Sequence, residues 1–238
     1  IGNDSWGKKL LSILENEGIN IEAINIIDNH PTTLKQRIYS DGKQVARLDT
    51  ETIIDWQPDS EMKHDYSNYD IIILSDYNKG VLNHPWFSIN NLDNVIVDPK
   101  KDVFSHYSQA NIITPNLNEL QRASKIEIND DKSLVNACNE LIQECNFNYI
   151  IAKKGDKGMT IVGKNNFVKH IEAHSVENPD VTGAGDTVVA ALSLAYAKTN
   201  DIELSVKIAN AAAAVVVGKS GTAVVTADEL KKKLNNLN

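Results

Sequence analysis

A turn of small residues that runs directly into a long apolar segment most constrains how this chain can fold. The turn occupies residues 180–186, with the sequence Asp-Val-Thr-Gly-Ala-Gly-Asp, and the apolar segment continues from residue 187 to 197. Such a segment predicts a buried helix, which makes the turn a helix N-terminus. Unpaired backbone N–H groups and the positive end of the helix dipole favour an anion there. Gly183 and Gly185 would let the backbone approach that anion closely, because glycine has no Cβ.

Asp186, the last residue of this turn, is the candidate general base. A carboxylate beside an anion site would repel a phosphate, but it is well placed to take a proton from an attacking hydroxyl group. An anion site with a neighbouring aspartate is what phosphoryl transfer to an alcohol requires. The alternative is a glycine-rich turn in which Asp186 is an ordinary helix cap.

The order of the remaining segments predicts an α/β fold. We expect helices at residues 6–17 (capped by Ser5), 130–145, 187–197 and 203–217, and a last helix that begins with a capping box at Thr226. We expect strands at residues 19–27, 70–74, 94–97, 111–113, 149–152, 159–162 and 167–171. Strands that alternate with helices predict a mostly parallel sheet covered on both faces, a three-layer sandwich. With no linker or repeat in view, we expect a single domain over residues 1–238.

A β-hairpin interrupts this alternation early in the chain. Residues 32–39 and 43–48 flank Asp41 and Gly42, a dipeptide that favours a tight hairpin turn. We expect this hairpin, near residues 32–49, to form a small β flap over a pocket.

Composition narrows the classes of function. The net charge is −8 and the one Lys-rich run is at residues 231–233, so we expect no nucleic-acid partner. No stretch is long and apolar enough to predict a membrane span. Cys138 and Cys145 are the only cysteines. Seven positions of one predicted helix would separate them by ~10 Å, too far for a disulfide. Together these features predict a cytoplasmic protein.

The turn at residues 180–186 and the apolar residues 188–192 that follow it resemble the C-terminal signature of the ribokinase-like (PfkB-type) sugar kinases. The resemblance implies a ribokinase-like fold and ATP-dependent phosphorylation of a sugar hydroxyl. It also implies that the backbone of Gly183, Ala184 and Gly185 forms an anion hole and that Asp186 is the catalytic base.

Asn116 and Glu119 match a second motif of these kinases, Asn-x-x-Glu, at a position just beyond a predicted strand. In the family this motif is associated with Mg²⁺ and phosphate, and the carboxylate would act through metal-bound water, since Mg²⁺ keeps several waters. The alternative is structural: Asn116 caps a helix and Glu119 completes its first turn. Both roles can coexist.

Three further loops narrow the resemblance to bacterial D-glycero-D-manno-heptose 7-phosphate kinases. They are Ser-Asp-Tyr-Asn-Lys-Gly at residues 75–80, Val-Asp-Pro-Lys at 97–100 and Thr-Pro-Asn-Leu-Asn-Glu at 114–119. Two further regions also resemble these kinases. They are the hairpin segments at residues 33–37 and 47–49, and the segments at residues 209–213 and 218–222. These enzymes phosphorylate the anomeric hydroxyl of the sugar phosphate, on the route to nucleotide-activated heptose for lipopolysaccharide. The residues implied in sugar or phosphate binding are Lys35, Arg37, Arg47, Asp76 and Lys79. The alternative is that these charged side chains face water and bind no ligand.

The resemblance also implies an ATP site and a set of nucleotide-side residues. These are Lys153, Gly155, Asp156, Gly158, Thr182, Asn210, Gly218 and Thr222. A monovalent cation such as K⁺ would lie near Asp180 and Thr182. His170 and His174 have metal-like spacing but lack the glutamate that a zinc protease motif places between them, so we expect two surface histidines.

The family pattern starts before residue 1, because the leading strands and their sugar-binding aspartate have no counterpart here. We therefore expect the chain as given to be catalytically weak. An exposed sheet edge would invite association, so a homodimer is an expectation. Two alternative functions stay open: a kinase for another sugar or a nucleoside, and a catalytically silent protein that binds a nucleotide or a sugar.

Overall fold

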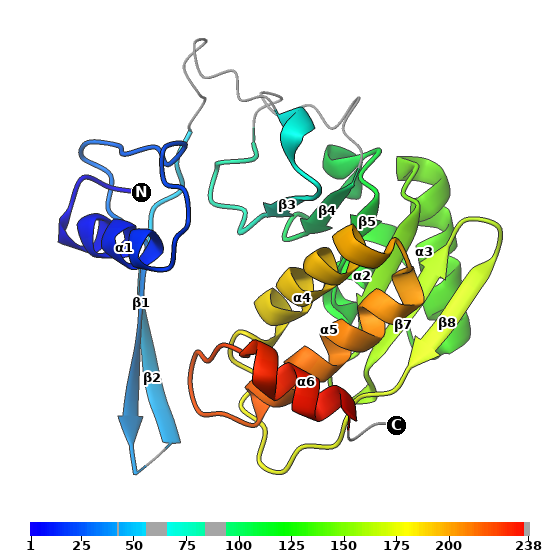
Figure 1. Cartoon of the computed structure of the whole chain (residues 1–238). Coiled ribbons are helices and arrows are strands. Elements are labelled where there is room, and N and C mark those ends of the chain that lie inside the picture. Colours follow the sequence, from blue (N-terminus) through cyan, green and yellow to red (C-terminus); the bar gives the residue numbers. More distant parts are fainter. Residues whose placement is uncertain (42, 56–65, 84–93, 236–238) are drawn as a thin grey trace. The chain divides into compact units, whose positions relative to one another are not determined.

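Six strands form the main sheet, and helices cover both of its faces. The computed structural model describes residues 1–41, 43–55, 66–83 and 94–235, and the sheet has the order β3-β4-β5-β6-β7-β8. The strands are β3 (Ile72–Ser75), β4 (Val95–Asp98), β5 (Ile112–Ile113), β6 (Tyr149–Lys153), β7 (Met159–Gly163) and β8 (Phe167–Ile171). The first four run parallel, whereas β7 and β8 are antiparallel to their neighbours. The predicted α/β sandwich with a mostly parallel sheet is confirmed (Figure 1).

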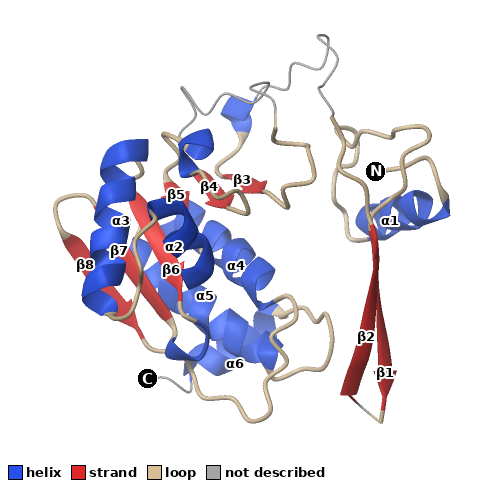
Figure 2. Ribbon diagram, turned by 180° about the vertical axis from the view of Figure 1, so that it is seen from behind, coloured by secondary structure: helices blue, strands red, loops and turns tan. Residues whose placement is uncertain are grey.

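Helices lie in two layers around this sheet (Figures 1 and 2). α2 (Leu117–Ser124) and α3 (Asp131–Cys145) pack against one face, and α4 (Ala184–Thr199) and α5 (Ile202–Val217) pack against the other, with α6 (Ala227–Asn235) against α5. Short 3₁₀ helices lie at Tyr66–Asn68, Phe104–Tyr107 and Gly155–Lys157. The core between the sheet and the α4–α5 pair includes Ile96, Ile112, Ile151, Ile161, Val188, Val189, Leu192, Val206 and Ala209. Apolar burial of this kind is the main stabilising term.

The short connection between β6 and β7 explains why the parallel pattern stops there. A parallel crossover needs a dozen or more residues, and only residues 154–158 join these two strands. Gly155 and Gly158 both have positive φ angles, 63° and 82°. A Cβ on Gly158 would also collide with the carbonyl oxygen of Ile171. Glycine is therefore required for the tight reversal that follows β6.

The chain divides into two compact units, which are described separately. The N-terminal unit comprises residues 1–56 and 79–83, and the C-terminal unit comprises residues 57–78 and 84–238. The sheet and helices α2 to α6 belong to the C-terminal unit. The expectation of a single domain stays a prediction.

The N-terminal unit consists of helix α1 (Ser5–Asn16) and the antiparallel hairpin of β1 (Leu34–Ser40) and β2 (Lys43–Thr50). The predicted hairpin is thus confirmed, although Gly42 of its turn lies outside the described residues. The cap of α1 differs from the prediction, because Asp4 rather than Ser5 accepts the N–H of Gly7, at 2.7 Å. Asp4 also accepts the N–H and hydroxyl of Thr32. Hydrogen bonds from Gly7 and Thr32 lower the pKa of Asp4 to about 2.

Two predicted strands differ from the structure. Residues 19–27 form turns, and their one strand-like contact is an isolated bridge between Ile27 and Gly2. A turn with a hydrogen bond from Ile24 N to Ile21 O breaks the extended conformation. The strand predicted as buried at residues 70–74 is β3, the edge of the sheet, where Ile73 is 41% exposed. An unbroken apolar run does not distinguish a central strand from an edge strand.

Two further expectations concern the cysteines and the membrane. Cys138 and Cys145 both lie in α3 as free, buried thiols, and burial raises the pKa of Cys138 to about 12. Within the part of the chain that the structure describes, no helix combines the length and the apolar character needed to cross a bilayer.

We predict that the packing of α4 on the sheet sets the stability of the C-terminal unit. Leu192 is fully buried in α4 and Leu194, two positions later, is 70% exposed. Leu192→Ala should lower the free energy of unfolding by about 2–5 kcal/mol, because it leaves a cavity between helix and sheet. Leu194→Ala is the matched control and should change it by less than about 0.5 kcal/mol. Urea unfolding followed by circular dichroism measures both, and equal losses in the two variants would contradict this packing.

Candidate active site

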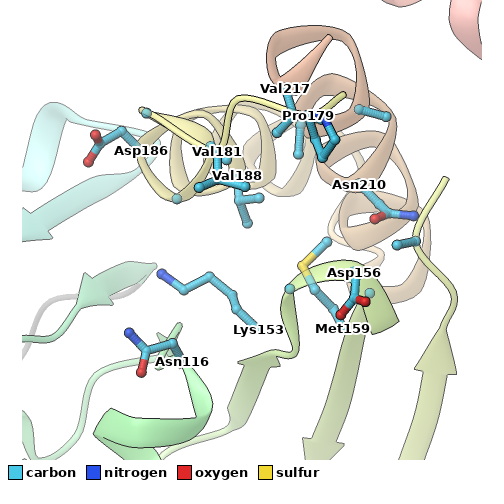
Figure 3. A pocket seen from close by; sticks show the side chains of 18 of the residues that line it. Asn116, Lys153, Asp156, Met159, Pro179, Val181, Asp186, Val188, Asn210 and Val217 are labelled. Atoms are coloured by element: carbon cyan, nitrogen blue, oxygen red, sulfur yellow. The ribbon is translucent and has the colours of Figure 1, made fainter. Parts of the chain in front are cut away.

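A cavity of about 830 Å³ lies in the C-terminal unit, between the carboxyl ends of the strands and the start of α4 (Figure 3). Ligands of open α/β sheets bind at this edge, because the loops that follow several strands meet there. Ten of the residues predicted from the sequence line the cavity: Asn116, Lys153, Gly155, Asp156, Gly158, Gly183, Ala184, Gly185, Asp186 and Asn210.

The start of α4 forms one wall of the cavity. Gly183 is the N-cap, with a left-handed φ of 77°, and Ala184, Gly185 and Asp186 make the first turn. A Cβ on Gly185 would lie 3.7 Å from the ammonium nitrogen of Lys153. Figure 3 shows Lys153 extending from the end of β6 towards this helix start. A cationic side chain thus faces the positive end of a helix dipole, an arrangement that suits an anion.

Two lysines and two acids form a charge network behind this wall. The Nζ atom of Lys153 lies 2.6 Å from Oδ1 of Asp98, and that of Lys100 lies 2.7 Å from Oε1 of Glu119. Lys100 also lies 3.9 Å from Oδ2 of Asp98. Burial alone would lower the pKa of Lys100. The hydrogen bond to Glu119 and the charges of Asp98, Glu119 and Asp186 outweigh that effect and raise it.

Asn116 and Glu119 form the capping box of α2. The side chain of Asn116 accepts the N–H of Glu119 at 2.9 Å, and Oε2 of Glu119 accepts the N–H of Asn116 at 2.8 Å. Glu119 is 3% exposed and does not line the cavity, whereas Asn116 does. The structural alternative for this pair is therefore realised. The described residues contain no cluster of three or more histidine, cysteine or acidic side chains that could hold a metal ion.

The loop after β3 brings a tyrosine to Asp186. The hydroxyl of Tyr77 donates to Oδ1 of Asp186 at 2.8 Å, and Tyr77 lines the cavity. Asp76, the neighbour named as a sugar-binding candidate, is 3% exposed and does not line it. Its two oxygens accept the N–H of Asn78 and the hydroxyl of Tyr107, each at 2.6 Å. Asp76 therefore anchors the loop, and Tyr77 is the residue of this loop that lines the cavity.

The opposite end of the cavity is mainly apolar. It is lined by Met159, Val176, Pro179, Val181, Val188, Ala213, Ala214 and Val217. Asn210 of α5 reaches this region and donates to the carbonyl of Glu172 at 2.7 Å. His174, which is half-buried, also lines the cavity. Burial and the charge of Lys233 lower its pKa.

Three predicted nucleotide-side residues lie near the cavity without lining it. Gly218 is the C-cap of α5, and the side chain of Thr222 lies 3.7 Å from where a Cβ on Gly183 would be. The N–H of Thr182 donates to Asp180, whose second oxygen accepts the N–H of Gly221 at 2.7 Å. Asp180 thus joins the loops that precede α4 and follow α5.

The remaining sugar-binding candidates belong to the N-terminal unit. Lys35 pairs with Asp49 and Glu51, at 3.0 and 3.2 Å. Two further ion pairs join Arg47 to Asp49 at 2.9 Å and Lys79 to Glu51 at 2.6 Å. Arg37 lies directly opposite Arg47 in the β1–β2 register.

Sequence reasoning overlooked Tyr77, whereas it considered Asp98 and Lys100 only in general terms, as strand-end charges that could bind a sugar hydroxyl or a phosphate oxygen. All three line the cavity, and all three follow or end a parallel strand. Their position at strand ends was the available signal. The sequence could not indicate which side chain of each loop turns towards the cavity.

Known structures share this architecture. A ribokinase of Thermotoga maritima superposes with a TM-score of 0.79 at 24% identity, over 99% of this chain and 80% of that one. A ribokinase of Arabidopsis thaliana complexed with ribose and ATP gives 0.80 at 20% identity, over 98% and 80%. The predicted ribokinase-like fold is confirmed.

Curated relatives are more similar in sequence. The bifunctional protein HldE of Rhodospirillum rubrum is 36% identical, over 97% of this chain and 49% of its own length. The HldE protein of Aliarcobacter butzleri is 37% identical, over 97% and 50%. The chain thus spans about half the length of these relatives. A family model described as pfkB family carbohydrate kinase matches residues 1–229. This match extends over nearly all of the sequence, and the chain therefore belongs to the pfkB family of carbohydrate kinases.

Proposed function

We propose that this chain is an ATP-dependent sugar kinase whose substrate is D-glycero-D-manno-heptose 7-phosphate, with the 1,7-bisphosphate as product. The position of Asp186 carries the proposal: it lies in the first turn of α4, at the mouth of an anion-binding helix N-terminus, and it lines the cavity. A base and an anion site side by side are the two elements that phosphoryl transfer to a hydroxyl needs.

In this mechanism Asp186 takes the proton of the anomeric hydroxyl as the sugar oxygen attacks the γ-phosphorus of ATP. The new oxygen–phosphorus bond forms while the bond to ADP breaks. Backbone N–H groups of the first turn of α4 and the ammonium of Lys153 stabilise the negative charge on the transferring group. The apolar end of the cavity, near Val176 and Val217, accommodates the adenine.

The charges of the cavity support a requirement for Mg²⁺. Lys100 and Lys153 face three carboxylates, those of Asp98, Glu119 and Asp186. The local charge is therefore negative before a polyphosphate arrives, and a divalent cation bound to the phosphates would offset the repulsion. Asn116 would contact that ion directly from the cavity wall, and Glu119 would act through water from behind it. Mg²⁺ supplies charge neutralisation on the phosphate oxygens.

Two observations support the choice of substrates. The A. thaliana ribokinase of the same fold holds ribose and ATP, which supports ATP as phosphoryl donor here. The loops at residues 75–80, 97–100 and 114–119 and the hairpin resemble heptose 7-phosphate kinases, which supports the sugar. The potassium complex of Escherichia coli phosphofructokinase-2, with a TM-score of 0.74 at 18% identity over 99% of this chain and 80% of that one, supports a monovalent cation near Asp180 and Thr182.

The hairpin provides cations for the 7-phosphate. Lys35, Arg37 and Arg47 of the hairpin, with Lys79 of the same unit, outnumber the two acids Asp49 and Glu51, which pair with Lys35, Arg47 and Lys79. Like charges directly opposite each other destabilise a hairpin, and Arg37 and Arg47 are such a pair. An anion between them removes the repulsion, and guanidinium groups match the geometry of phosphate oxygens.

The role of Asp186 is tested by substitution. Asp186→Asn keeps the size of the side chain but removes the base, so kcat should fall about 10²–10⁴-fold while the affinity for ATP changes by less than about threefold. Asp102→Asn, an exposed aspartate paired with Arg122 away from the cavity, is the control and should retain full activity. Steady-state kinetics and calorimetric titration with ATP measure both quantities. A loss below tenfold in Asp186→Asn would rule this residue out as the base.

The identity of the sugar is tested with a panel and one hairpin variant. The kcat/KM for the heptose 7-phosphate should exceed that for ribose, fructose 6-phosphate and nucleosides. Arg47→Gln should raise the KM for the heptose phosphate at least about tenfold and leave the KM for ATP unchanged, because a charge-assisted hydrogen bond is lost. Lys8→Gln, on α1 of the same unit, should change neither. A higher kcat/KM with another sugar would refute the heptose phosphate as the substrate but not the sugar-kinase activity. ATP binding without phosphate transfer to any sugar would refute both the substrate and the kinase activity.

The two roles of Glu119 can be separated by a pair of variants. Glu119→Ala leaves the buried N–H of Asn116 without its acceptor and should lower the free energy of unfolding by about 2–3 kcal/mol. Glu119→Gln keeps an acceptor in the capping box and should cost less. The loss of charge in Glu119→Gln should nevertheless raise the Mg²⁺ concentration that gives half-maximal rate. Urea unfolding and a Mg²⁺ titration of the rate measure the two effects. An unchanged Mg²⁺ dependence would show that Glu119 acts only in the capping box of α2.

A further inference from the structure

Tyr77 makes a direct contact with the carboxylate of Asp186 that the proposed chemistry does not yet use. Its hydroxyl donates to Oδ1 at 2.8 Å, across 109 positions of sequence. Tyr77 is 48% exposed, so it is not a core tyrosine held by burial. The contact leaves the second carboxylate oxygen, Oδ2, for another donor.

The loop that carries Tyr77 is held in place by a buried acid. Asp76 accepts the N–H of Asn78 and the hydroxyl of Tyr107, each at 2.6 Å, and its own N–H donates to the carbonyl of Asp98 at 3.1 Å. Asn78 takes a left-handed conformation with φ of 54°, which closes the turn. Residues on both sides of Tyr77 are thus fixed, so the direction of its side chain is set by the backbone.

The hydroxyl of Tyr77 is a permanent donor under ordinary conditions. Burial of its ring and the hydrogen bond to Asp186, with further contributions from the charges of Asp186 and Asp98, raise the pKa of Tyr77 to about 12. The other charged groups of this part of the cavity are the ammonium groups of Lys100 and Lys153. A protonated phenol beside a carboxylate donates a hydrogen bond and keeps its proton.

We infer that Tyr77 is a positioning residue for the catalytic base, which holds Oδ1 of Asp186 and directs Oδ2 to the sugar hydroxyl. This inference rests on the proposed function. The proton of the sugar passes to Oδ2, and Tyr77 keeps its own. Asp186 lies on an exposed helix turn, where a carboxylate without such a partner would sample several rotamers and meet the hydroxyl in only some of them.

Removal of the hydroxyl tests the inference in the kinase reaction. Tyr77→Phe should lower kcat about tenfold or more and leave the KM for ATP within about twofold, because the base loses its fixed direction while the contacts of the ATP site stay the same. Tyr149→Phe removes a hydroxyl at the other end of β6, where the ring packs against Phe167, and should change none of these values. Wild-type kcat in Tyr77→Phe would overturn the inference.

A second measurement needs no sugar and so separates this inference from the proposed function. The absorbance difference between the wild-type chain and Tyr77→Phe isolates the ionisation of Tyr77, followed up to pH 11 while circular dichroism monitors the fold. In the Asp186→Asn background the negative charge is gone, so more of Tyr77 should be ionised at pH 11 than in the wild type. Equal ionisation would show that the phenol and the carboxylate do not interact. If the chain transfers phosphate to no sugar but shows this difference in ionisation, the proposed kinase activity is refuted, while the interaction between Tyr77 and Asp186 is supported.

Discussion

The packing of α4 against the sheet is the constraint on which the rest of the site depends. Val188 and Leu192 of this helix lie in the core with Ile96 and Ile112 of the central strands. Because the helix is held along its length by apolar burial, its first turn must lie opposite the ends of β4 and β6. The proposed anion site at Gly183 to Asp186 and the ammonium of Lys153 are therefore brought together by side chains that would take no part in the chemistry.

Electrostatics then decides what this edge of the sheet can hold. Burial ordinarily lowers the pKa of a lysine. The pKa of Lys100 is raised instead, because the nearby carboxylates outweigh the effect of burial. Each lysine pairs with an acid, which holds its ammonium group in place. The pairs keep the cationic ends rigid, and a rigid charge near a transferring phosphoryl group stabilises it without first having to reorganise.

The sequence predicted the parts of this molecule that local patterns determine. Residues 180–186 predicted a helix start, and α4 begins there with Gly183 as its N-cap. The capping box of Asn116 and Glu119 and the buried helix at residues 203–217 followed from short-range patterns as well. The predictions that differ depend on distant contacts. Asp4 caps α1 because Thr32, 28 positions away, also donates to it, and no pattern near Ser5 contains that information.

Asp76 and Tyr77 show the same limit within the site. Both follow a strand, and an aspartate is the more usual sugar-binding residue, so sequence reasoning favoured Asp76. In the structure Tyr77 lines the cavity and Asp76 does not, because Tyr107 takes up one oxygen of Asp76 in the protein interior. Neighbouring side chains on an extended segment point in opposite directions. A strand-end motif thus predicts that a cavity residue is present, while the register of the loop determines which one it is.

The two units differ in charge in a way that bears on how two phosphates could be distinguished. In the C-terminal cavity the carboxylates outnumber the lysines. On and beside the hairpin the cations Lys35, Arg37, Arg47 and Lys79 outnumber Asp49 and Glu51. In the proposed reaction, a metal-bound nucleotide and a metal-free sugar phosphate would match these opposite balances. Under the proposed function, the sign of the local charge would therefore contribute to specificity before any hydroxyl of the sugar is recognised.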